Sequence, residues 1–300
     1  MFGIVIPAFR GGKYLEELIK SLINGSNHNW EAIIVDDSKS SQILNELSDM
    51  KLDSRFTVLR NDENRGPFAS WNIGLEELLE RNKYDLVAVV HEDDVLAMNY
   101  INNFVLYFSR YPKIDIYHSK VKLIGSNGRR KFTFQDVVKR LSFRQLSRKP
   151  IISYADKGLA NILRKNFIFC PTMVFNVRSF DEIKFSNRWK MVGDLDFIAN
   201  ALLSGRTFLQ LPDKNYFYRR HENNLTVKLT STTTRFHEEL QIYNELEEVC
   251  KTAGFNASAK VAGNARIIKL HIAYRIVISL VRFDLSGLRQ LISVYPFKKN

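Results

Sequence analysis

Two clusters of carboxylates come directly after apolar runs of the chain. Asp36-Asp37 follows one run, and Glu92-Asp93-Asp94 follows another. Adjacent carboxylates resist joint ionisation unless a cation neutralises them. Oxygen ligands favour Mg²⁺ or Mn²⁺, and Mg²⁺ usually binds through one or two carboxylates together with substrate phosphates. The clusters therefore predict a divalent-metal site for a nucleotide diphosphate, although either cluster alone could instead cap the following helix.

Two later segments also carry residues with catalytic chemistry. Asp194 could act as a general base, or it could cap the apolar helix expected over 195–203. The segment 218–224 contains Arg219, Arg220 and His221. Arginine offers a planar fork to phosphate oxygens, and histidine can bind a metal or a phosphate. His221 is the preferred histidine, and a solvated loop histidine is the alternative.

Strands and helices alternate over the first part of the chain. Their periodicity predicts strands over 2–9, 30–35, 56–59, 86–90 and 114–123, and helices over 14–23, 41–50, 67–80 and 99–108. Such alternation is typical of βαβ units in a mainly parallel, doubly wound α/β sheet. Ligands bind such sheets at the carboxyl ends of the strands, so both acidic clusters should face one crevice.

The alternation weakens beyond residue 125. Short strands are expected over 172–177 and 207–211, within a second lobe, and the chain is helical in pattern from about Thr234. The composition is 45% hydrophobic, enough for a substantial core. Cys170 and Cys250 match no disulfide or zinc spacing, and no secretory leader or spanning segment is expected. A cytoplasmic protein is therefore predicted.

The net charge of +12 is concentrated in two segments. The segments 129–149 and 260–300 each contain eight Lys or Arg and one acid, so the rest of the chain is close to neutral. This distribution argues against a nucleic-acid-binding protein, for which no recognisable module is present. Basic segments of this kind suit anionic lipid headgroups or phosphate-bearing substrates, or they are solvated helix faces.

Several motifs, taken in order, resemble glycosyltransferase family 2, whose fold is named GT-A. The resemblance covers about residues 2–226. It comprises Ile4-Val5-Ile6-Pro7-Ala8-Phe9, Ile34-Val35-Asp36-Asp37-Ser38, Asn64-Arg65-Gly66-Pro67, Trp71-Asn72-Ile73-Gly74, Val90 to Asp94, and Gly193-Asp194-Leu195-Asp196-Phe197. It implies a nucleotide-sugar-binding half over 1–115, an acceptor-binding and catalytic-base half over 116–233, and a C-terminal helical region over 234–300.

The resemblance also implies roles in donor binding. Asp37 would bond the imide edge of uracil or thymine, with Phe9 near the base face. The first strand with Pro7 and the turn with Asn64 and Gly66 belong to the same nucleotide site.

The resemblance also implies which residues bind the metal and catalyse the reaction. Asp93 and Asp94 would serve Mn²⁺ or Mg²⁺ and the sugar nucleotide, while Arg220 and His221 would close over the diphosphate, with His221 a candidate metal ligand. Asp194 would be the catalytic base. The sequence departs from the family pattern at His91, where an aspartate is common, and at Gly193, where a glutamate is frequent. His91 is a ligand, an outer-sphere donor or a structural residue.

The resulting prediction is an inverting transfer of a sugar from a UDP- or dTDP-sugar to a hydroxyl of a glycan, in surface-polysaccharide assembly. The alternatives are a sugar-1-phosphate nucleotidyltransferase, disfavoured because the first loop is poor in glycine, and a catalytically inactive scaffold.

One long helix is expected over Ile267–Val294. Arg275, Arg282 and Arg289 recur every seven residues and would line one face of it. Its apolar remainder would pack on the protein, on a second subunit as a homodimer, or on an anionic membrane that carries a lipid-linked glycan acceptor.

Overall fold

The computed structural model describes residues 1–38, 40, 42–50, 52–129, 147–165 and 167–295, so most of the first basic segment lies outside the described residues. The chain packs into two units. The first comprises Met1–Ser153, Ile168–Asn187 and Arg206–Arg220, and the second comprises Tyr154–Phe167, Arg188–Gly205 and His221–Asn300. The chain thus passes repeatedly between the units, whereas three consecutive regions were expected. The roles assigned to those regions stay predictions.

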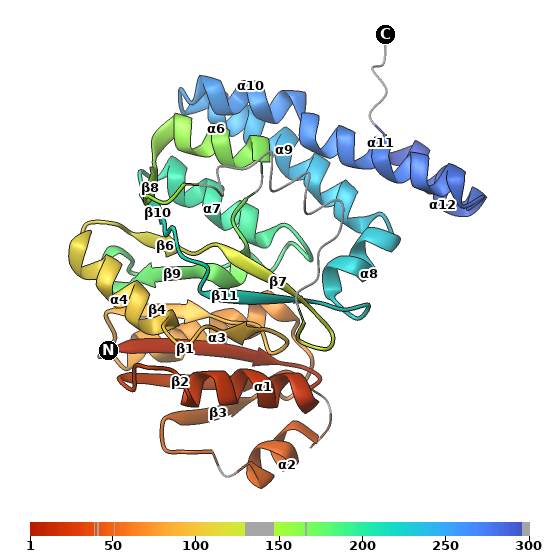
Figure 1. The fold of residues 1–300 in the computed structure, drawn as a ribbon. Coiled ribbons are helices and arrows are strands. Elements are labelled where there is room, and N and C mark those ends of the chain that lie inside the picture. Colours follow the sequence, from red (N-terminus) through yellow and green to blue (C-terminus); the bar gives the residue numbers. More distant parts are fainter. Residues whose placement is uncertain (39, 41, 51, 130–146, 166, 296–300) are drawn as a thin grey trace. The chain divides into compact units, whose positions relative to one another are not determined.

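An eight-stranded sheet forms the centre of the first unit (Figure 1). Its order is β3-β2-β1-β4-β9-β6-β10-β8. The first four strands are parallel, as are β6 and β10, while the other neighbours are antiparallel. The bounds are β1 Phe2–Ala8, β2 Trp30–Asp36, β3 Phe56–Arg60, β4 Leu86–Val89, β6 Ile116–His118, β8 Ile151–Ser153, β9 Met173–Asn176 and β10 Phe208–Gln210. The mainly parallel α/β sheet predicted from the sequence is confirmed.

A second, three-stranded sheet has the order β5-β11-β7. It contains β5 (Val95–Leu96), β7 (Val121–Gly125) and β11 (Tyr216–Arg220). The single strand expected over 114–123 is therefore wrong, because β6 and β7 belong to different sheets. Both β6 and its partner β10 leave the large sheet together and continue as the paired strands β7 and β11. The sequence gives no sign of this bend, because buried apolar residues occur on both sides of it, Ile116 and Tyr117 in β6 and Val121 and Ile124 in β7.

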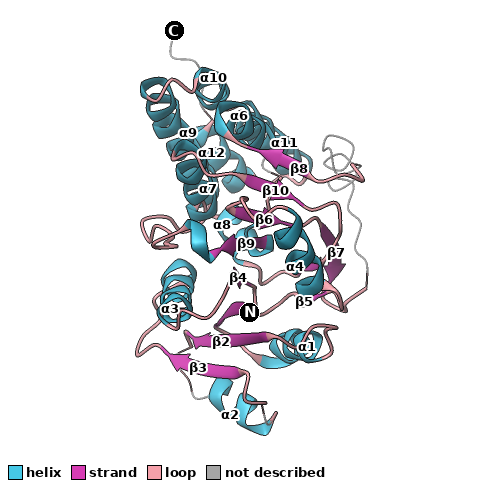
Figure 2. Cartoon of the chain, turned by 90° about the vertical axis from the view of Figure 1, so that its left-hand side faces the viewer, coloured by secondary structure: helices cyan, strands magenta, loops and turns pink. Residues whose placement is uncertain are grey.

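Helices cover both faces of the parallel strands. α1 (Gly12–Ile23) and α4 (Tyr100–Arg110) lie on one face, and α3 (Pro67–Glu80) lies on the other (Figure 2). α2 (Gln42–Asp49) precedes β3. Successive side chains of β1 point alternately to the two faces of the sheet. Its even-numbered apolar residues join the core cluster with α1 and α4, while Gly3 and Val5 face α3.

Gly74 lets α3 approach the sheet closely. A Cβ at this position would lie 2.4 Å from Cγ1 of Val5 and 3.1 Å from Cγ2 of Val35. Both neighbours are β-branched side chains on buried strands, so they have little freedom to move away. The glycine in the Trp71–Gly74 motif is thus required by packing.

We expect Gly74→Ala to lower the free energy of unfolding by about 1–3 kcal/mol, the usual effect of overpacking a core. The matched control is Gly263→Ala in a helix of the second unit, where the three side-chain atoms nearest to the added Cβ form the flexible carboxylate end of Glu247. Because alanine favours helix over glycine by up to about 1 kcal/mol, the control should be neutral or stabilising. Urea unfolding followed by circular dichroism measures both. Equal effects of the two substitutions would refute the close approach at Gly74.

The second unit is helical among its described residues. Its helices are α6 Ala155–Lys165, α7 Gly193–Leu203, α8 Leu225–Ser231, α9 Thr234–Thr252, α10 Asn256–Asn264, α11 Arg266–Val281 and α12 Leu285–Val294. Asp156 at the start of α6 accepts hydrogen bonds from the N–H groups of Ala257 and Ser258, at 2.8 and 2.7 Å. Although burial opposes ionisation, bonds from Ser258 and Ala257 lower the pKa of Asp156. This carboxylate therefore ties α6 to the start of α10.

The long helix expected over Ile267–Val294 is wrong, because the chain forms two helices there. α11 ends at Val281, Phe283 adopts a left-handed backbone with φ 56°, and the Asp284 carboxylate caps α12 by accepting from the N–H of Gly287. Arg275 and Arg289 consequently lie on different helices and do not share one stripe. The heptad spacing of the arginines gave no sign of the cap.

Candidate active site

The carboxyl ends of β1, β2 and β4 meet at one edge of the sheet. β1 lies between the other two strands and is parallel to both, with Ala8 opposite Asp36 and Val5 opposite Val89. Both acidic clusters therefore follow strands that end at the same edge of the sheet, while the prediction that they face one crevice stays a prediction. Pro7 lies in β1 beyond its last pair with β4, where its nitrogen, which has no hydrogen, is not required by the β4 ladder.

Asp37 organises the loop that precedes α3. Its carboxylate accepts hydrogen bonds from the Asn61 side chain at 2.7 Å and from the N–H groups of Arg65 at 2.8 Å and Gly66 at 2.9 Å. The Asn64 amide donates to the backbone oxygen of Asp37 at 3.2 Å, and Gly66 has φ 83°. The structure thus brings Asp37, Asn64 and Gly66 together, while their contact with a nucleotide stays a prediction.

The loop after β1 is held by Glu92. The Glu92 carboxylate accepts from the N–H groups of Phe9 and Gly11 at 3.0 Å and of Arg10 at 3.2 Å. Burial raises the pKa of Glu92, against the opposing effect of these hydrogen bonds. The Phe9 side chain remains 50% exposed, as a ring that stacks on a base would need to be. Sequence reasoning had placed Glu92 with the metal-binding residues, but its carboxylate serves this loop.

His91, Asp93 and Asp94 form a group that could hold a metal ion. One ligand atom from each lies within 4.8 Å of the others. Asp94 has no exposed side-chain surface, and its burial together with the nearby charge of Asp93 raises its pKa well above the ordinary value. Such a carboxylate is stable as an anion only beside a cation. Burial lowers the pKa of His91, so its imidazole is neutral, as a ligand must be.

These three donors fit a divalent ion. Two carboxylates suit Mg²⁺ or Mn²⁺, and an imidazole is compatible with Mn²⁺. The structure brings together His91, Asp93 and Asp94, all three of which were candidates from the sequence, and their metal role stays a prediction. His91 also packs against the Trp71 ring, with centroids 5.4 Å apart. Its place beside Asp94, with Nδ1 3.9 Å from Oδ2, favours the ligand over the purely structural interpretation.

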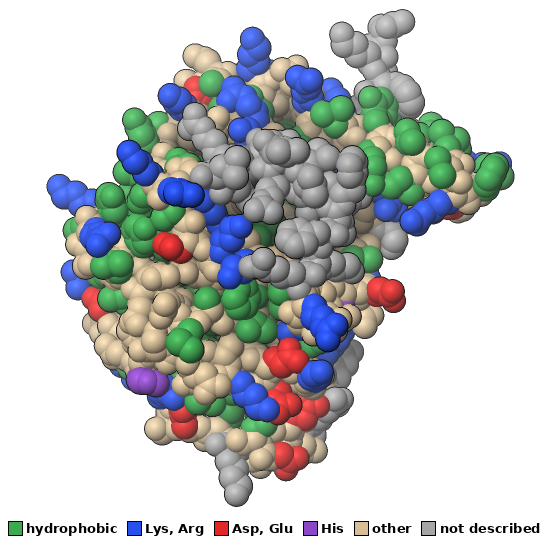
Figure 3. Space-filling view, viewed as in Figure 1, with side chains coloured by type: hydrophobic (Ala, Val, Ile, Leu, Met, Phe, Trp, Pro, Cys, Tyr) green, Lys and Arg blue, Asp and Glu red, His purple; other side chains and the backbone are tan. Residues whose placement is uncertain are grey.

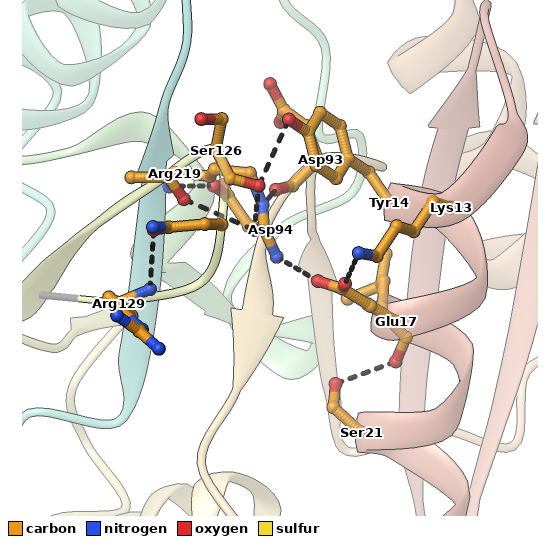
Figure 4. A network of polar contacts seen from close by, with 12 residues as sticks. Lys13, Tyr14, Glu17, Ser21, Asp93, Asp94, Ser126, Arg129 and Arg219 are labelled. Atoms are coloured by element: carbon orange, nitrogen blue, oxygen red, sulfur yellow. Dashed lines mark hydrogen bonds and ion pairs between the residues drawn. The ribbon is translucent and has the colours of Figure 1, made fainter.

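A buried arginine anchors this group. Arg219 of β11 has no exposed side-chain surface, and its N–H donates to Asp94 Oδ1 at 2.7 Å. Its guanidinium donates to the backbone oxygen of Asp93 at 2.6 Å and forms an ion pair with Glu17 of α1 (Figure 4). The guanidinium also lies 4.5 Å from the centre of the Tyr14 ring. Arg219 therefore holds both the backbone and the side chain of the acidic cluster.

Tyr216 supports the cluster from the same strand. Its hydroxyl oxygen accepts from the N–H of His91 at 3.1 Å, and its side chain is fully buried. Burial, with the charge of Asp94, raises the pKa of Tyr216 well above the ordinary value, so the hydroxyl keeps its proton. Sequence reasoning missed both Tyr216 and Arg219 as supports. One signal was available, because consecutive arginines on a strand must point to opposite faces. Arg220, the predicted phosphate ligand, is the one that remains partly exposed.

Asp194 belongs to the second unit. It is the second residue of α7, and its Oδ1 accepts from the neighbouring Leu195 N–H at 2.8 Å. Burial raises the pKa of Asp194 to about 6, although Arg235 opposes this rise. The alternative of Asp194 as the N-cap is wrong, because Val192 occupies that position. The preceding N–H groups of Lys190, Met191 and Val192 donate instead to Glu238 of α9.

His221 also belongs to the second unit, where its N–H donates to the side chain of Asn224 at 2.6 Å. The catalytic role of Asp194 and the diphosphate or metal role of His221 stay predictions.

The sequence matches a known family over most of this region. Residues 3–183 match the profile of glycosyl transferase family 2. The chain belongs to this family. An uncharacterized glycosyltransferase of Haemophilus influenzae is 29% identical over 42% of the chain and 53% of its own length. GgaA of Bacillus subtilis, a minor teichoic acid biosynthesis protein, is 25% identical over 74% of the chain and 48% of its own length. The chain spans about half the length of these two relatives.

Solved glycosyltransferase structures share the fold. Residues 1–349 of Staphylococcus aureus TarS in complex with UDP-GlcNAc align with a TM-score of 0.68 and 18% identity, over 98% of this chain and 79% of that chain. The mannosyltransferase PcManGT of Pyrobaculum calidifontis, in complex with GDP-Man and Mn²⁺, aligns with a TM-score of 0.58 and 12% identity, over 100% of this chain and 88% of that chain. The family 2 chain described here therefore has the GT-A fold, as predicted.

We expect Glu17→Gln to weaken Mn²⁺ binding by roughly 10-fold, within the range found when partners of metal ligands are removed. The substitution removes the charge that holds the buried Arg219 guanidinium, and Arg219 in turn positions Asp93 and Asp94. Calorimetric titration of the full chain with MnCl₂ measures the affinity. Glu16→Gln is the matched control, since the neighbouring Glu16 pairs only with Lys20 on the surface of α1. Equal affinities for Glu17→Gln and the control would exclude the positioning role.

Proposed function

We propose that this chain is an inverting, metal-assisted glycosyltransferase that moves a sugar from a UDP- or dTDP-sugar to a hydroxyl of a glycan, in surface-polysaccharide synthesis. The observation that carries the proposal is the group of His91, Asp93 and Asp94 at the edge of the sheet where Asp37 also lies. Family membership, a relative in teichoic acid biosynthesis and a structural neighbour bound to UDP-GlcNAc support it.

The residues of the first unit would bind the donor. Asp37 holds the loop with Asn64 and Gly66 against the strand edge, where the base would meet Asp37 and the ring of Phe9. Asp93, Asp94 and His91 would hold Mn²⁺ or Mg²⁺ beside the diphosphate. When bound, the ion would neutralise charge that develops on the leaving diphosphate. Arg219 and Tyr216 keep the ligands in place before the donor arrives, which reduces reorganisation during the reaction.

Residues of the second unit would serve the acceptor and the leaving group. In an inverting transfer, one carboxylate accepts the proton of the acceptor hydroxyl while the diphosphate departs from the opposite face of the sugar. Asp194 would do this, since a carboxyl group with a pKa of about 6 is ionised at neutral pH and a stronger base than an ordinary aspartate. Arg220, at the end of β11, and His221, in the second unit, would contact the diphosphate.

One alternative from the sequence is weakened by the structure. A nucleotidyltransferase would need free backbone N–H groups in the loop after the first strand to hold phosphates. The N–H groups of Phe9, Arg10 and Gly11 all donate to the Glu92 carboxylate. A phosphate in their place would have to displace the half-buried Glu92 side chain, which carries a charge of the same sign. The proposal includes the cytoplasmic location predicted from the sequence, in which Cys170 and Cys250 match no disulfide or zinc spacing.

The primary test is donor turnover with and without metal. We expect hydrolysis or transfer from UDP-sugars to require Mn²⁺ or Mg²⁺, to be lost with EDTA, and to be abolished in Asp94→Asn together with metal-dependent UDP binding. The variant should fold, because the amide oxygen can still accept from Arg219 and a buried charge is removed. Asp49→Asn, an exposed carboxylate on α2, is the control. Unchanged UDP affinity and turnover in Asp94→Asn would overturn the metal assignment. A chain that binds UDP and metal without turnover of any donor would be an inactive scaffold.

We expect Asp194→Asn to keep donor and metal binding and to lower kcat by about 10²- to 10⁴-fold, as removal of a general base does. Asp196→Asn, in the same helical turn, is the matched control and should retain most activity, because the Asp196 side chain bonds Asn200 within its own helix. A large loss in Asp196→Asn alone would transfer the base to that residue.

The pH profile of the wild-type chain provides a second readout of the same assignment. Because the base must be ionised, kcat/KM should fall about tenfold per pH unit below pH 6 and level off above it. Asp194→Asn should lack this dependence. Its melting temperature at pH 7 should be unchanged or higher. The raised pKa of Asp194 means that stability falls as the pH rises from 3.8 to about 6, and the full loss remains at pH 7, where Asp194 is ionised.

A further inference from the structure

The helices α11 and α12 have apolar residues on surfaces that the protein does not cover. α11 is buried along one face through Ile268, Ile272 and Ser279. Its opposite face exposes Leu270, Tyr274, Val277 and Val281, at the spacing of successive helical turns, with exposed fractions between 41% and 73%. A helix that packs only on its own unit needs one apolar face, so the second apolar face requires another explanation.

The turn between the helices is the most exposed apolar part of this surface. Phe283 is 88% exposed, Val281 73% and Leu285 67%. Phe283 adopts a left-handed backbone, which an aromatic residue rarely does without a reason. Hydrophobic side chains gather over α11 and α12 in the space-filling view (Figure 3). Exposed apolar surface of this extent marks an interaction site.

The positive charge of the same segment indicates which kind of partner this surface would bind. Residues 260–300 contain eight Lys or Arg and a single acid, Asp284, whose carboxylate caps α12. Arg266, Arg282 and Arg289 are exposed beside the apolar residues. A second copy of the chain would bring two surfaces of the same strong positive charge together, which is unfavourable. An anionic lipid surface would attract the arginines and accept the apolar side chains.

We propose that the α11–α12 hairpin is an interfacial membrane anchor, with Phe283, Val281 and Leu285 inserted among the headgroups of anionic lipids and the flanking arginines bound to their phosphates. None of the helices in the described part of the chain is long and apolar enough to cross a membrane. The anchor would bring the second unit to the surface on which lipid-linked glycans are carried. It does not depend on the proposed transfer reaction, because vesicle binding needs no donor or metal.

The test is co-sedimentation of the full-length chain with vesicles of phosphatidylglycerol and phosphatidylcholine, compared with vesicles of phosphatidylcholine alone. We expect binding to the anionic vesicles only, weakened by salt. Phe283→Asn removes the ring, and asparagine tolerates the left-handed backbone, so the variant should fold and bind about tenfold more weakly. Arg282→Gln/Arg289→Gln should lower affinity by more than about tenfold. Met98→Ser, at a residue 67% exposed in the first unit, is the control and should bind like the wild type.

Three results would overturn the anchor. They are equal binding to both kinds of vesicle, equal binding by Phe283→Asn and the wild type, and no binding at low salt. A concentration-dependent dimer in light scattering that Phe283→Asn abolishes would assign the surface to self-association instead. Metal-dependent UDP binding should be the same in Phe283→Asn and the wild type, so failure of the anchor and failure of the proposed reaction are distinguishable.

Discussion

The carboxylate of Asp94 has no contact with solvent, and much of the first unit is arranged around it. Asp94 comes shortly after β4, which is buried along its whole length and runs parallel to β1. The residues after β4 therefore lie at the carboxyl edge of the sheet. An isolated buried anion would be costly, so its surroundings must either supply a cation or keep it protonated. The Arg219 N–H and the Tyr216 side chain partly stabilise the Asp94 carboxylate by hydrogen bonding. Burial raises the pKa of Asp94 despite these bonds, and His91 and Asp93 lie close enough to offer further donors to an ion.

Other carboxylates of the chain are used differently, as acceptors for backbone N–H groups. Asp37 holds the loop before α3, Glu92 holds the loop after β1, and Glu238 holds the segment before α7. Each one joins segments distant in sequence and fixes a loop next to a proposed functional residue. Negative charges near helix N-termini are also favourable to the helices that follow. The loops are therefore positioned by the resting protein, which is the arrangement that a site for a charged donor requires.

The C-terminal helices α11 and α12 differ from the other helices of the second unit in how they pack. Asp156 bonds α10, and Tyr243 of α9 donates to the backbone oxygen of Leu163 in α6 at 2.6 Å, so α6, α9 and α10 are connected by buried polar contacts. A smaller share of the residues in α11 and α12 is buried, and these helices expose many apolar side chains. α6, α9 and α10 thus form the packed part of the unit, whereas α11 and α12 have exposed apolar surface that a partner could cover.

The sequence by itself determined the class of the fold and the edge of the sheet at which the site lies. Hydrophobic periodicity is a local property, and for the β1, α1, β2, α2 and α3 segments it agreed with the burial of their apolar residues because each element has one clear apolar pattern, while β3 is only partly buried. The motifs around Asp37 and Asp94 likewise needed only their position after a strand.

Tertiary structure decided what no local pattern contains. The split between β6 and β7 depends on pairing with β10 and β11, which are about a hundred residues away. The break between α11 and α12 depends on a cap that competes with helix continuation. Whether Glu92 or Asp93 joins the group that could hold a metal, and whether Arg219 or Arg220 turns inward, depends on which neighbours fill each side of a strand or loop. Those neighbours, Glu17 among them, are brought there by folding, because electrostatic and packing energies depend on distance in space and not on distance along the chain.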